Sequence, residues 1–202
     1  MISIDTLASR LQTYRPRRMP GRRWVRRCGV VLLLAEHGPD GEAIAPALLM
    51  MRRTERLGDP WSGHVSFPGG RVNRHDVDTR AAALRELHEE TGFAPLGQLT
   101  PIGRLSDRLT REHARPLPMV ISPYVYRADR AVSLQPSAEA ARLWWAPLSH
   151  LLAPERRRTV IWRIAGVPLK APAIDVGGAR LWGLSLAMAK ELLRAAGLTR
   201  FR

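Results

Sequence analysis

The sequence contains a single cysteine, Cys28, among its 202 residues, so an intramolecular disulfide is excluded. The apolar neighbours of Cys28, residues 30–34, predict a buried structural thiol rather than a reactive one. No apolar run approaches the roughly 20 residues that a membrane-spanning helix needs, and the N-terminus lacks the hydrophobic core of a signal peptide. We therefore expect a cytoplasmic protein without a membrane segment.

Acidic residues are scarce, and lysine is nearly absent. The chain has 18 Asp and Glu against 32 Lys and Arg, which gives a formal net charge of +14, and Lys170 and Lys190 are its only lysines. A surface rich in arginine attracts phosphorylated ligands and binds nucleic acid non-specifically, in a salt-dependent way. For the basic arm at residues 15–23, a solvated linker is a better interpretation than an RNA-binding tail, because aromatic side chains for base stacking are scarce apart from Trp24.

The length and the hydrophobic content of 45% suit one α/β domain with short additions at its ends. We expect a basic N-terminal helix and arm at residues 1–24, the main domain at residues 25–197 and a basic tail at residues 198–202. Apolar residues at helical spacing predict that residues 3–14 form an amphipathic helix that packs on the domain.

Continuous or alternating apolar patterns predict the strands and the last helix. The expected strands cover residues 27–34, 47–54, 97–105 and 119–126, and the first two form a hairpin. Residues 106–118 are polar and are expected to form a loop beside the functional site. A second hairpin around residues 166–168 is followed by a helix that runs through Leu193 and ends at Gly197.

Carboxylates and an arginine gather in residues 85–93, which read Arg-Glu-Leu-His-Glu-Glu-Thr-Gly-Phe. Good helix formers after a capping Asp78 predict a helix that Gly92 ends. At about 100° per residue, Glu86, Glu89 and Glu90 fall within an arc of roughly 100°. Repulsion disfavours this arrangement unless a cation lies among the carboxylates, and Mg²⁺ prefers carboxylate and water oxygens. The alternative is an acidic helix face in contact with water.

Residues 85–93 resemble the signature of the Nudix hydrolases, G-x5-E-x7-R-E-U-x-E-E-x-G-U, in which U is a bulky apolar residue. All nine of its last positions match. The signature glycine is displaced by one residue, to Gly70, and Val77, flanked by two aspartates, stands where the signature has glutamate. The longer loop, the aspartates and the Phe-Pro-Gly-Gly run resemble the coenzyme A pyrophosphatase subgroup, as does the Trp-Gly-x-Ser step at residues 182–185.

The resemblance implies an α/β fold, the Nudix-type α/β/α sandwich with a mixed β-sheet, and hydrolysis of a diphosphate linkage. It implies Mg²⁺ or Mn²⁺ bound by Glu86, Glu89, Glu90 and the backbone carbonyl of Gly70. It also implies that Glu89 or Glu86 is the catalytic base and that Arg85 holds the carboxylates in place. Because members of the family are frequently dimers, a homodimer is a possible assembly.

Coenzyme A or a derivative is the expected substrate, cleaved to 3′,5′-ADP and 4′-phosphopantetheine. One alternative is a pyrophosphatase that acts on ADP-ribose, nucleotide sugars or dinucleotides. An alternative of another class is a non-catalytic module that binds nucleotide or RNA through its arginines.

Five arginines are candidates to bind the phosphates of the substrate: Arg53, Arg56, Arg71, Arg108 and Arg111. For any single loop arginine, the alternative is an ordinary surface position. His64 is either a proton shuttle or a structural residue, and the second role is the commoner one. Glu139 precedes an expected tryptophan-containing strand and short helix, and it is either a further metal-site carboxylate or a helix cap.

Overall fold

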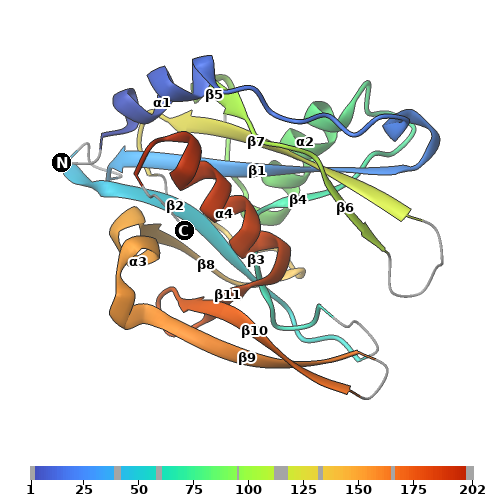
Figure 1. Cartoon of the computed structure of the whole chain (residues 1–202). Coiled ribbons are helices and arrows are strands. Elements are labelled where there is room, and N and C mark those ends of the chain that lie inside the picture. Colours follow the sequence, from blue (N-terminus) through green and yellow to red (C-terminus); the bar gives the residue numbers. More distant parts are fainter. Residues whose placement is uncertain are drawn as a thin grey trace.

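A computed structural model describes residues 3–38, 42–57, 61–94, 96–111, 118–131, 134–164 and 167–198. An eight-stranded sheet carries helices on both faces, and a three-stranded sheet lies beside it (Figure 1). In chain order the elements are α1 (Ile4–Thr13), η1 (Arg22–Trp24), β1 (Arg26–His37), β2 (Ala43–Arg53), β3 (Val65–Ser66), β4 (Gly69–Arg71), α2 (Thr79–Thr91), η2 (Leu96–Gln98), β5 (Leu99–Arg104), β6 (Arg108–Arg111), β7 (Pro118–Ala128), β8 (Ala140–Pro147), α3 (Leu148–Leu152), η3 (Pro154–Arg156), β9 (Arg157–Ile164), β10 (Val167–Asp175), β11 (Arg180–Trp182) and α4 (Gly183–Ala195).

The large sheet is mixed. Its main order is β3-β2-β1-β7-β5, while β4 pairs with β1, β6 with β7 and β8 with β2. β1 and β7 run parallel, in register from Arg26 opposite Met119 to Leu34 opposite Arg127, and the other pairs are antiparallel. The predicted fold class, an α/β structure with a mixed sheet, is confirmed.

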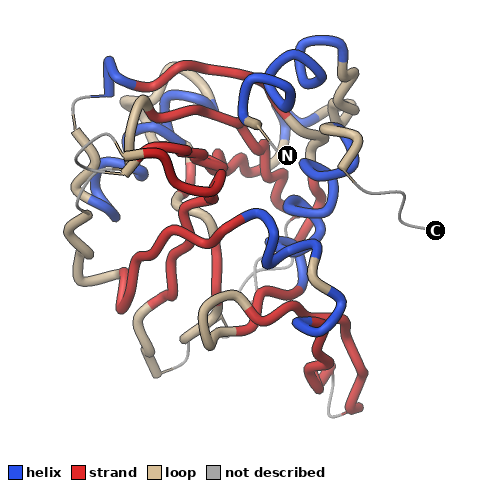
Figure 2. Tube along the Cα trace, turned by 90° about the vertical axis from the view of Figure 1, so that its left-hand side faces the viewer, coloured by secondary structure: helices blue, strands red, loops and turns tan. Residues whose placement is uncertain are grey.

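β1 is the central strand of the sandwich because both of its faces are buried. Val31 and Leu33 belong to the apolar cluster that contains Leu87 of α2. Leu32 belongs to the cluster that contains Leu192 of α4, as expected when successive side chains of a strand point to opposite faces. In Figure 2, helices accordingly lie on both sides of the large sheet. The strand predicted over residues 27–34 and the hairpin that it forms with β2 are confirmed.

The predicted N-terminal helix is α1, and it is part of the core. Ile4, Leu7 and Leu11 are at most 3% exposed and share a cluster with residues of α4. The arm that follows is anchored, since the backbone N–H of Asp107 donates to the carbonyl of Arg17 at 2.9 Å. The solvated-linker interpretation is therefore wrong at this point of the arm. The boundary predicted at residue 24 stays a prediction.

Residues 106–118 are only partly a loop, because β6 forms within them. β7 is long enough to pair with β5 through its C-terminal half and with β6 through its N-terminal half. Residues 112–117 of the predicted loop lie outside the described residues. The predicted C-terminal hairpin is β9 and β10, to which β11 adds a third strand. The predicted last helix is α4, and it is followed by Gly197 with a φ of +67°.

Candidate active site

The last turns of α2 lie against β4, the short strand that contains Gly69 and Gly70. The helix starts at Asp78, whose carboxylate accepts hydrogen bonds from two backbone N–H groups of the first turn, and it ends at Gly92, whose φ is +66°. Both predicted caps are therefore confirmed. The helix brings Glu90 to β4, where the N–H of Gly69 donates to Oε2 of Glu90 at 2.8 Å. A hydrogen bond to a carboxylate thus joins the helix to the strand.

The two glycines allow β4 to approach its neighbours very closely. Gly69 has a φ of +154°, and a Cβ there would lie 2.4 Å from the carbonyl oxygen of Gly29 in β1, so this position requires glycine. A Cβ atom at Gly70 would lie 2.3 Å from Cδ of Glu86. The carboxylate of Glu86 therefore lies directly beside the backbone of Gly70.

Arg85 joins the carboxylates of the site to one another. Its Nη1 donates to Glu86 and to Glu89, at 2.8 Å each. Its Nε and Nη2 donate to the two oxygens of Asp76, at 3.1 and 3.0 Å, and Nη2 also donates to the carbonyl of Arg71 at 3.1 Å. The hydrogen bonds with Asp76 and the glutamates raise the pKa of Arg85 and keep it charged. The geometry supports the predicted role of Arg85, which is to hold the carboxylates in place.

Glu90 is a buried carboxylate in an unfavourable electrostatic environment. It is 3% exposed, and burial raises its pKa to about 8 against the opposing hydrogen bond from Gly69. The negative charges of Glu86 and Glu139 raise the pKa of Glu90 further. Burial also raises the pKa of Glu86, despite its contact with Arg85. An acidic helix face in contact with water does not describe these residues, because Glu90 faces the interior.

The predicted metal ligands fit a divalent cation in character, although they are not gathered as a closed cage. Within the described residues, no three His, Cys, Asp or Glu side chains converge on one point that could hold an ion. Glu89 is 53% exposed and turns toward Arg85, as mutual repulsion of carboxylates favours. Mg²⁺ is typically bound by one or two protein carboxylates together with water and substrate phosphates. Glu86 and Glu90 beside Gly70 match that requirement.

The five arginines predicted to bind the substrate phosphates lie in different parts of the structure. The positive charge of Arg53 lowers the pKa of Glu90, so Arg53 lies close to the carboxylates. Nη1 of Arg56 contacts Oε1 of Glu139 at 3.2 Å, at the exposed side of the same group. The side chain of Arg71 is exposed, and the backbone carbonyl of Arg71 accepts a hydrogen bond from Nη2 of Arg85.

The other two arginine candidates lie elsewhere. Arg108 forms an ion pair with Glu191 of α4, on the opposite face of the sheet from α2. The interpretation of Arg108 as a phosphate-binding residue is therefore not supported. The side chain of Arg111 lies outside the described residues.

His64 packs among tryptophans. The centroid of its ring lies 4.9 Å from that of Trp182 and 5.8 Å from that of Trp162, with the rings nearly edge-on. The two tryptophan rings are themselves 5.0 Å apart. This environment supports the structural role of His64, the commoner of the two roles that we expected.

Asp76 is a residue of the site that the sequence did not identify as functional. It binds Arg85 through both carboxylate oxygens, and its own pKa is lowered by those hydrogen bonds. The signal was present, because Asp76 directly precedes Val77, where the Nudix signature has its first glutamate. Counting the signature strictly led to Val77, which is 90% exposed.

A family model for the NUDIX domain matches residues 24–163, which is more than half of the chain. The chain belongs to the Nudix family. Its class is therefore that of a Nudix pyrophosphohydrolase, as the resemblance of residues 85–93 predicted. Nudix hydrolases generally use divalent metal ions and bind nucleotide-derived substrates.

Relatives of known sequence agree with this assignment. An uncharacterized Nudix hydrolase, NudL, of Citrobacter koseri is 34% identical over 152 residues, which cover 70% of this chain and 73% of the relative. The mitochondrial coenzyme A diphosphatase NUDT8 of Homo sapiens is 33% identical over 166 residues, or 76% of this chain and 69% of that protein.

Solved Nudix structures share the fold. A MutT/nudix family protein from Enterococcus faecalis aligns with a TM-score of 0.52 at 17% identity, over 98% of this chain and 70% of that one. A NUDIX hydrolase from Alicyclobacillus acidocaldarius aligns with a TM-score of 0.51 at 16% identity, over 85% and 92% of the two chains. The predicted Nudix-type fold is thus confirmed. In the described part of the chain, no helix has the length and apolar composition that crossing a bilayer requires.

Proposed function

We propose that this Nudix protein hydrolyses the diphosphate linkage of coenzyme A or its derivatives, with Mg²⁺ or Mn²⁺ as the cofactor. The observation that carries the proposal is the junction of α2 with β4, where Glu90 and Glu86 meet the backbone of Gly69 and Gly70. The coenzyme A diphosphatase among the relatives supports the choice of substrate.

The residues of the site have separate tasks in this proposal. Glu86, Glu90 and the carbonyl of Gly70 hold the metal ion, and Glu89 is a further ligand. When bound, the ion neutralises charge on the diphosphate and activates a water molecule. Glu86 or Glu89 accepts the proton of that water.

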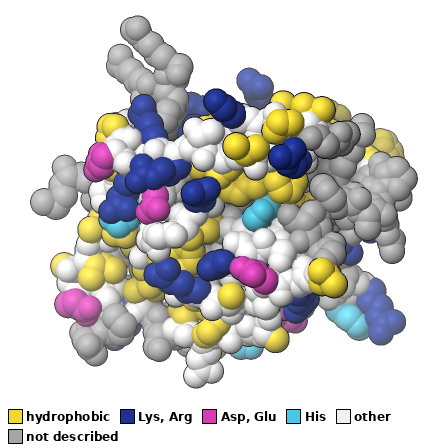
Figure 3. Space-filling model, turned by 90° about the horizontal axis from the view of Figure 1, so that it is seen from below, with side chains coloured by type: hydrophobic (Ala, Val, Ile, Leu, Met, Phe, Trp, Pro, Cys, Tyr) yellow, Lys and Arg dark blue, Asp and Glu magenta, His cyan; other side chains and the backbone are white. Residues whose placement is uncertain are grey.

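Positioning comes from the surrounding cations. Arg85 keeps Glu86 and Glu89 at hydrogen-bond distance from one guanidinium group, so neither carboxylate is free to rotate away. Arg53, Arg56 and Arg71 bind the phosphates of the substrate at the rim of this group. On the face shown in Figure 3, Lys and Arg side chains are interspersed with apolar and acidic ones. Such a mixed surface supports binding of a small anionic substrate, with nucleic acid bound only non-specifically.

Turnover of a panel of substrates tests the proposal. Coenzyme A, ADP-ribose, NADH and dinucleoside polyphosphates are each incubated with the protein and Mg²⁺ or Mn²⁺, and the products are identified by mass. We expect 3′,5′-ADP and 4′-phosphopantetheine from coenzyme A. Faster turnover of another member of the panel would reassign the substrate, and no turnover of any member would favour a nucleotide-binding module. Light scattering on the same sample tests the predicted homodimer.

A further inference from the structure

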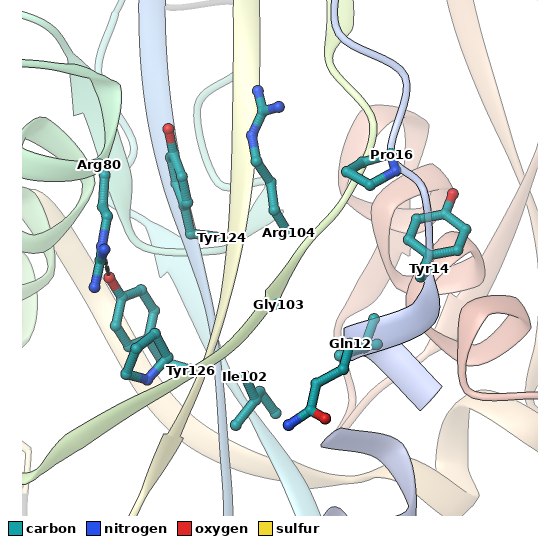
Figure 4. A pocket seen from close by; sticks show the side chains of 11 residues that line it. Gln12, Tyr14, Pro16, Arg80, Ile102, Gly103, Arg104, Tyr124 and Tyr126 are labelled. Atoms are coloured by element: carbon teal, nitrogen blue, oxygen red, sulfur yellow. Dashed lines mark hydrogen bonds between the residues drawn. The ribbon is translucent and has the colours of Figure 1, made fainter. Parts of the chain in front are cut away.

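A cavity of about 440 Å³ lies at the first turn of α2, away from the acidic residues of the site. The C-terminal end of α1 and the start of the arm form one side of it, and β5, β7 and α2 form the other (Figure 4). This volume falls within the range of about 300–1,000 Å³ that is typical of small-molecule pockets.

The cavity and the candidate active site occupy opposite ends of α2. Arg80 lines the cavity from the first turn, whereas Glu86 and Glu90 lie six and ten residues further along the helix. At 1.5 Å per residue, these separations correspond to about 9 and 15 Å along the helix axis. None of the acidic residues of the candidate active site lines the cavity.

Two arginines place positive charge at the cavity. Nε of Arg80 donates to the hydroxyl of Tyr126, and its guanidinium lies 5.6 Å from the centre of that ring. Arg80 is exposed, and no carboxylate of the described residues lies within ion-pair distance of it. The charge of Asp78 acts on Arg80 without an ion-pair contact, so an anion at the mouth of the cavity would meet a guanidinium group that no described carboxylate touches.

Arg104 is the second cation. It contacts Asp107 and Ser122 through Nη2, while its Nε and Nη1 are buried without a hydrogen bond to any described residue. Its guanidinium lies 5.6 Å from the ring centre of Tyr124. Buried donors that lack a partner are rare in proteins, so these N–H groups favour an acceptor near this wall of the cavity.

The other lining residues are mainly apolar or aromatic, and the tyrosine rings among them end in hydroxyl groups. Tyr124 and Tyr126 point to the same side of β7, about 7 Å apart, whereas Tyr14 lies on the opposite face of the sheet, where its hydroxyl donates to Glu191. Gln12 adds an exposed amide at the end of α1. No Asp or Glu is among the lining residues. Tyrosine rings with arginines and no carboxylate match a planar aromatic ligand that carries negative charge.

We propose that this cavity is a second ligand site, which binds an aromatic phosphate monoester of mononucleotide size. Arg80 binds the phosphate, the aromatic ring packs against Tyr124, and Arg104 contributes positive charge beside Tyr124. The proposal does not depend on the hydrolase reaction, because the cavity shares no residue with the acidic group.

Calorimetric titration of the full-length protein with AMP in EDTA tests the site. We expect saturable binding to the wild type, and about tenfold weaker binding by Arg80→Gln, which loses one charge-assisted contact. Arg158→Gln is the matched control, because Arg158 is an exposed arginine of β9 whose guanidinium donates to the carbonyls of Glu155 and Arg157 and does not line the cavity. Arg158→Gln and Glu90→Gln should bind AMP as the wild type does. Adenosine and inorganic phosphate should each bind about tenfold or more weakly than AMP, since each lacks half of the recognised groups.

Gln12→Trp gives a test that does not rely on Arg80. It introduces a large side chain at an exposed position on the rim and should block AMP without disturbing the fold, which thermal unfolding checks. Photocrosslinking with 8-azido-AMP should label the peptide that contains Tyr124. The proposal is overturned if AMP does not bind in EDTA, if both arginine variants weaken binding equally, or if the label maps to the peptide that contains Glu86 and Glu90.

Discussion

Glu90 and Glu191 are both glutamates on helices, and each is 3% exposed, but their surroundings differ. Burial raises the pKa of Glu191, and hydrogen bonds from Ser106 and Tyr14 and the charge of Arg108 outweigh that effect, so the pKa lies below its ordinary value. The N–H of Ser106 and the hydroxyl of Tyr14 both donate to Oε1 of Glu191 at 2.7 Å.

Glu90 has one backbone N–H donor and two carboxylates nearby, so its pKa rises to about 8. Glu191 is thus a buried charge that the protein itself neutralises, whereas Glu90 is one that the protein leaves under-compensated. A buried carboxylate of the second kind is typical of functional sites, where a cation or a proton completes the balance. The comparison distinguishes a structural ion pair from a candidate metal ligand without reference to any signature.

The largest effect that we expect from the difference between Glu90 and Glu191 is a loss of catalytic activity when Glu90 is replaced. Glu90→Gln should lower kcat for the best substrate of the panel by about 10³-fold or more, because the neutral amide no longer balances the charge of the metal ion. The amide oxygen can still accept the hydrogen bond from Gly69, so the fold should persist. Steady-state kinetics and circular dichroism check both points. Substantial metal-dependent activity in a folded Glu90→Gln protein would contradict the assigned role.

The second prediction concerns stability against pH without metal. The pKa of Glu90 rises from its ordinary value of 4.5 to about 8 on folding, so the folded chain holds its proton more tightly than the unfolded chain. The free energy of unfolding should therefore fall between pH 4.5 and 8, by up to about 5 kcal/mol, and the penalty should be constant at higher pH. Urea unfolding in EDTA measures this slope, which Glu90→Gln should remove. A wild-type slope that Glu90→Gln leaves unchanged would show that another group titrates.

The third prediction uses Glu191 as the counterpart. Glu191→Gln should lower the free energy of unfolding at pH 7 by about 2 kcal/mol, because Arg108 loses its ionised partner next to a buried position. The pKa of Glu191 is lowered on folding, so its contribution is present above the ordinary pKa and is lost as the pH falls. The kcat of the folded fraction should not change. A loss of kcat as large as that of Glu90→Gln would erase the distinction between the two glutamates.

The group of residues around Glu90 was predictable from the spacing of those residues in the sequence. Glu86, Glu89, Glu90 and Arg85 lie within six residues of one helix, whose period determines their relative directions, and the caps at Asp78 and Gly92 have clear sequence signals.

The surroundings of Glu191, in contrast, depend on tertiary structure. Arg108 and Glu191 lie 83 residues apart and meet only because β6 pairs with the N-terminal half of β7. The region of β6 was predicted as a loop since its four residues are mostly charged or polar. Asp76 was missed for a related reason, because a one-residue change in loop length moves a side chain without changing the composition.

The smallest effect should come from Glu139, the weaker of the two carboxylates whose charges raise the pKa of Glu90. Its charge raises the pKa of Glu90, but its side chain is 50% exposed and contacts Arg56, so solvent and that arginine screen it. Glu139→Gln should therefore shift the pH dependence of stability toward lower pH by only about 0.3 units. Glu55→Gln is the matched control, because Glu55 is also exposed and contacts Arg52 at 2.9 Å, and it is not among the charges that act on Glu90. Equal shifts in both variants would mean that net charge, rather than proximity to Glu90, determines its protonation.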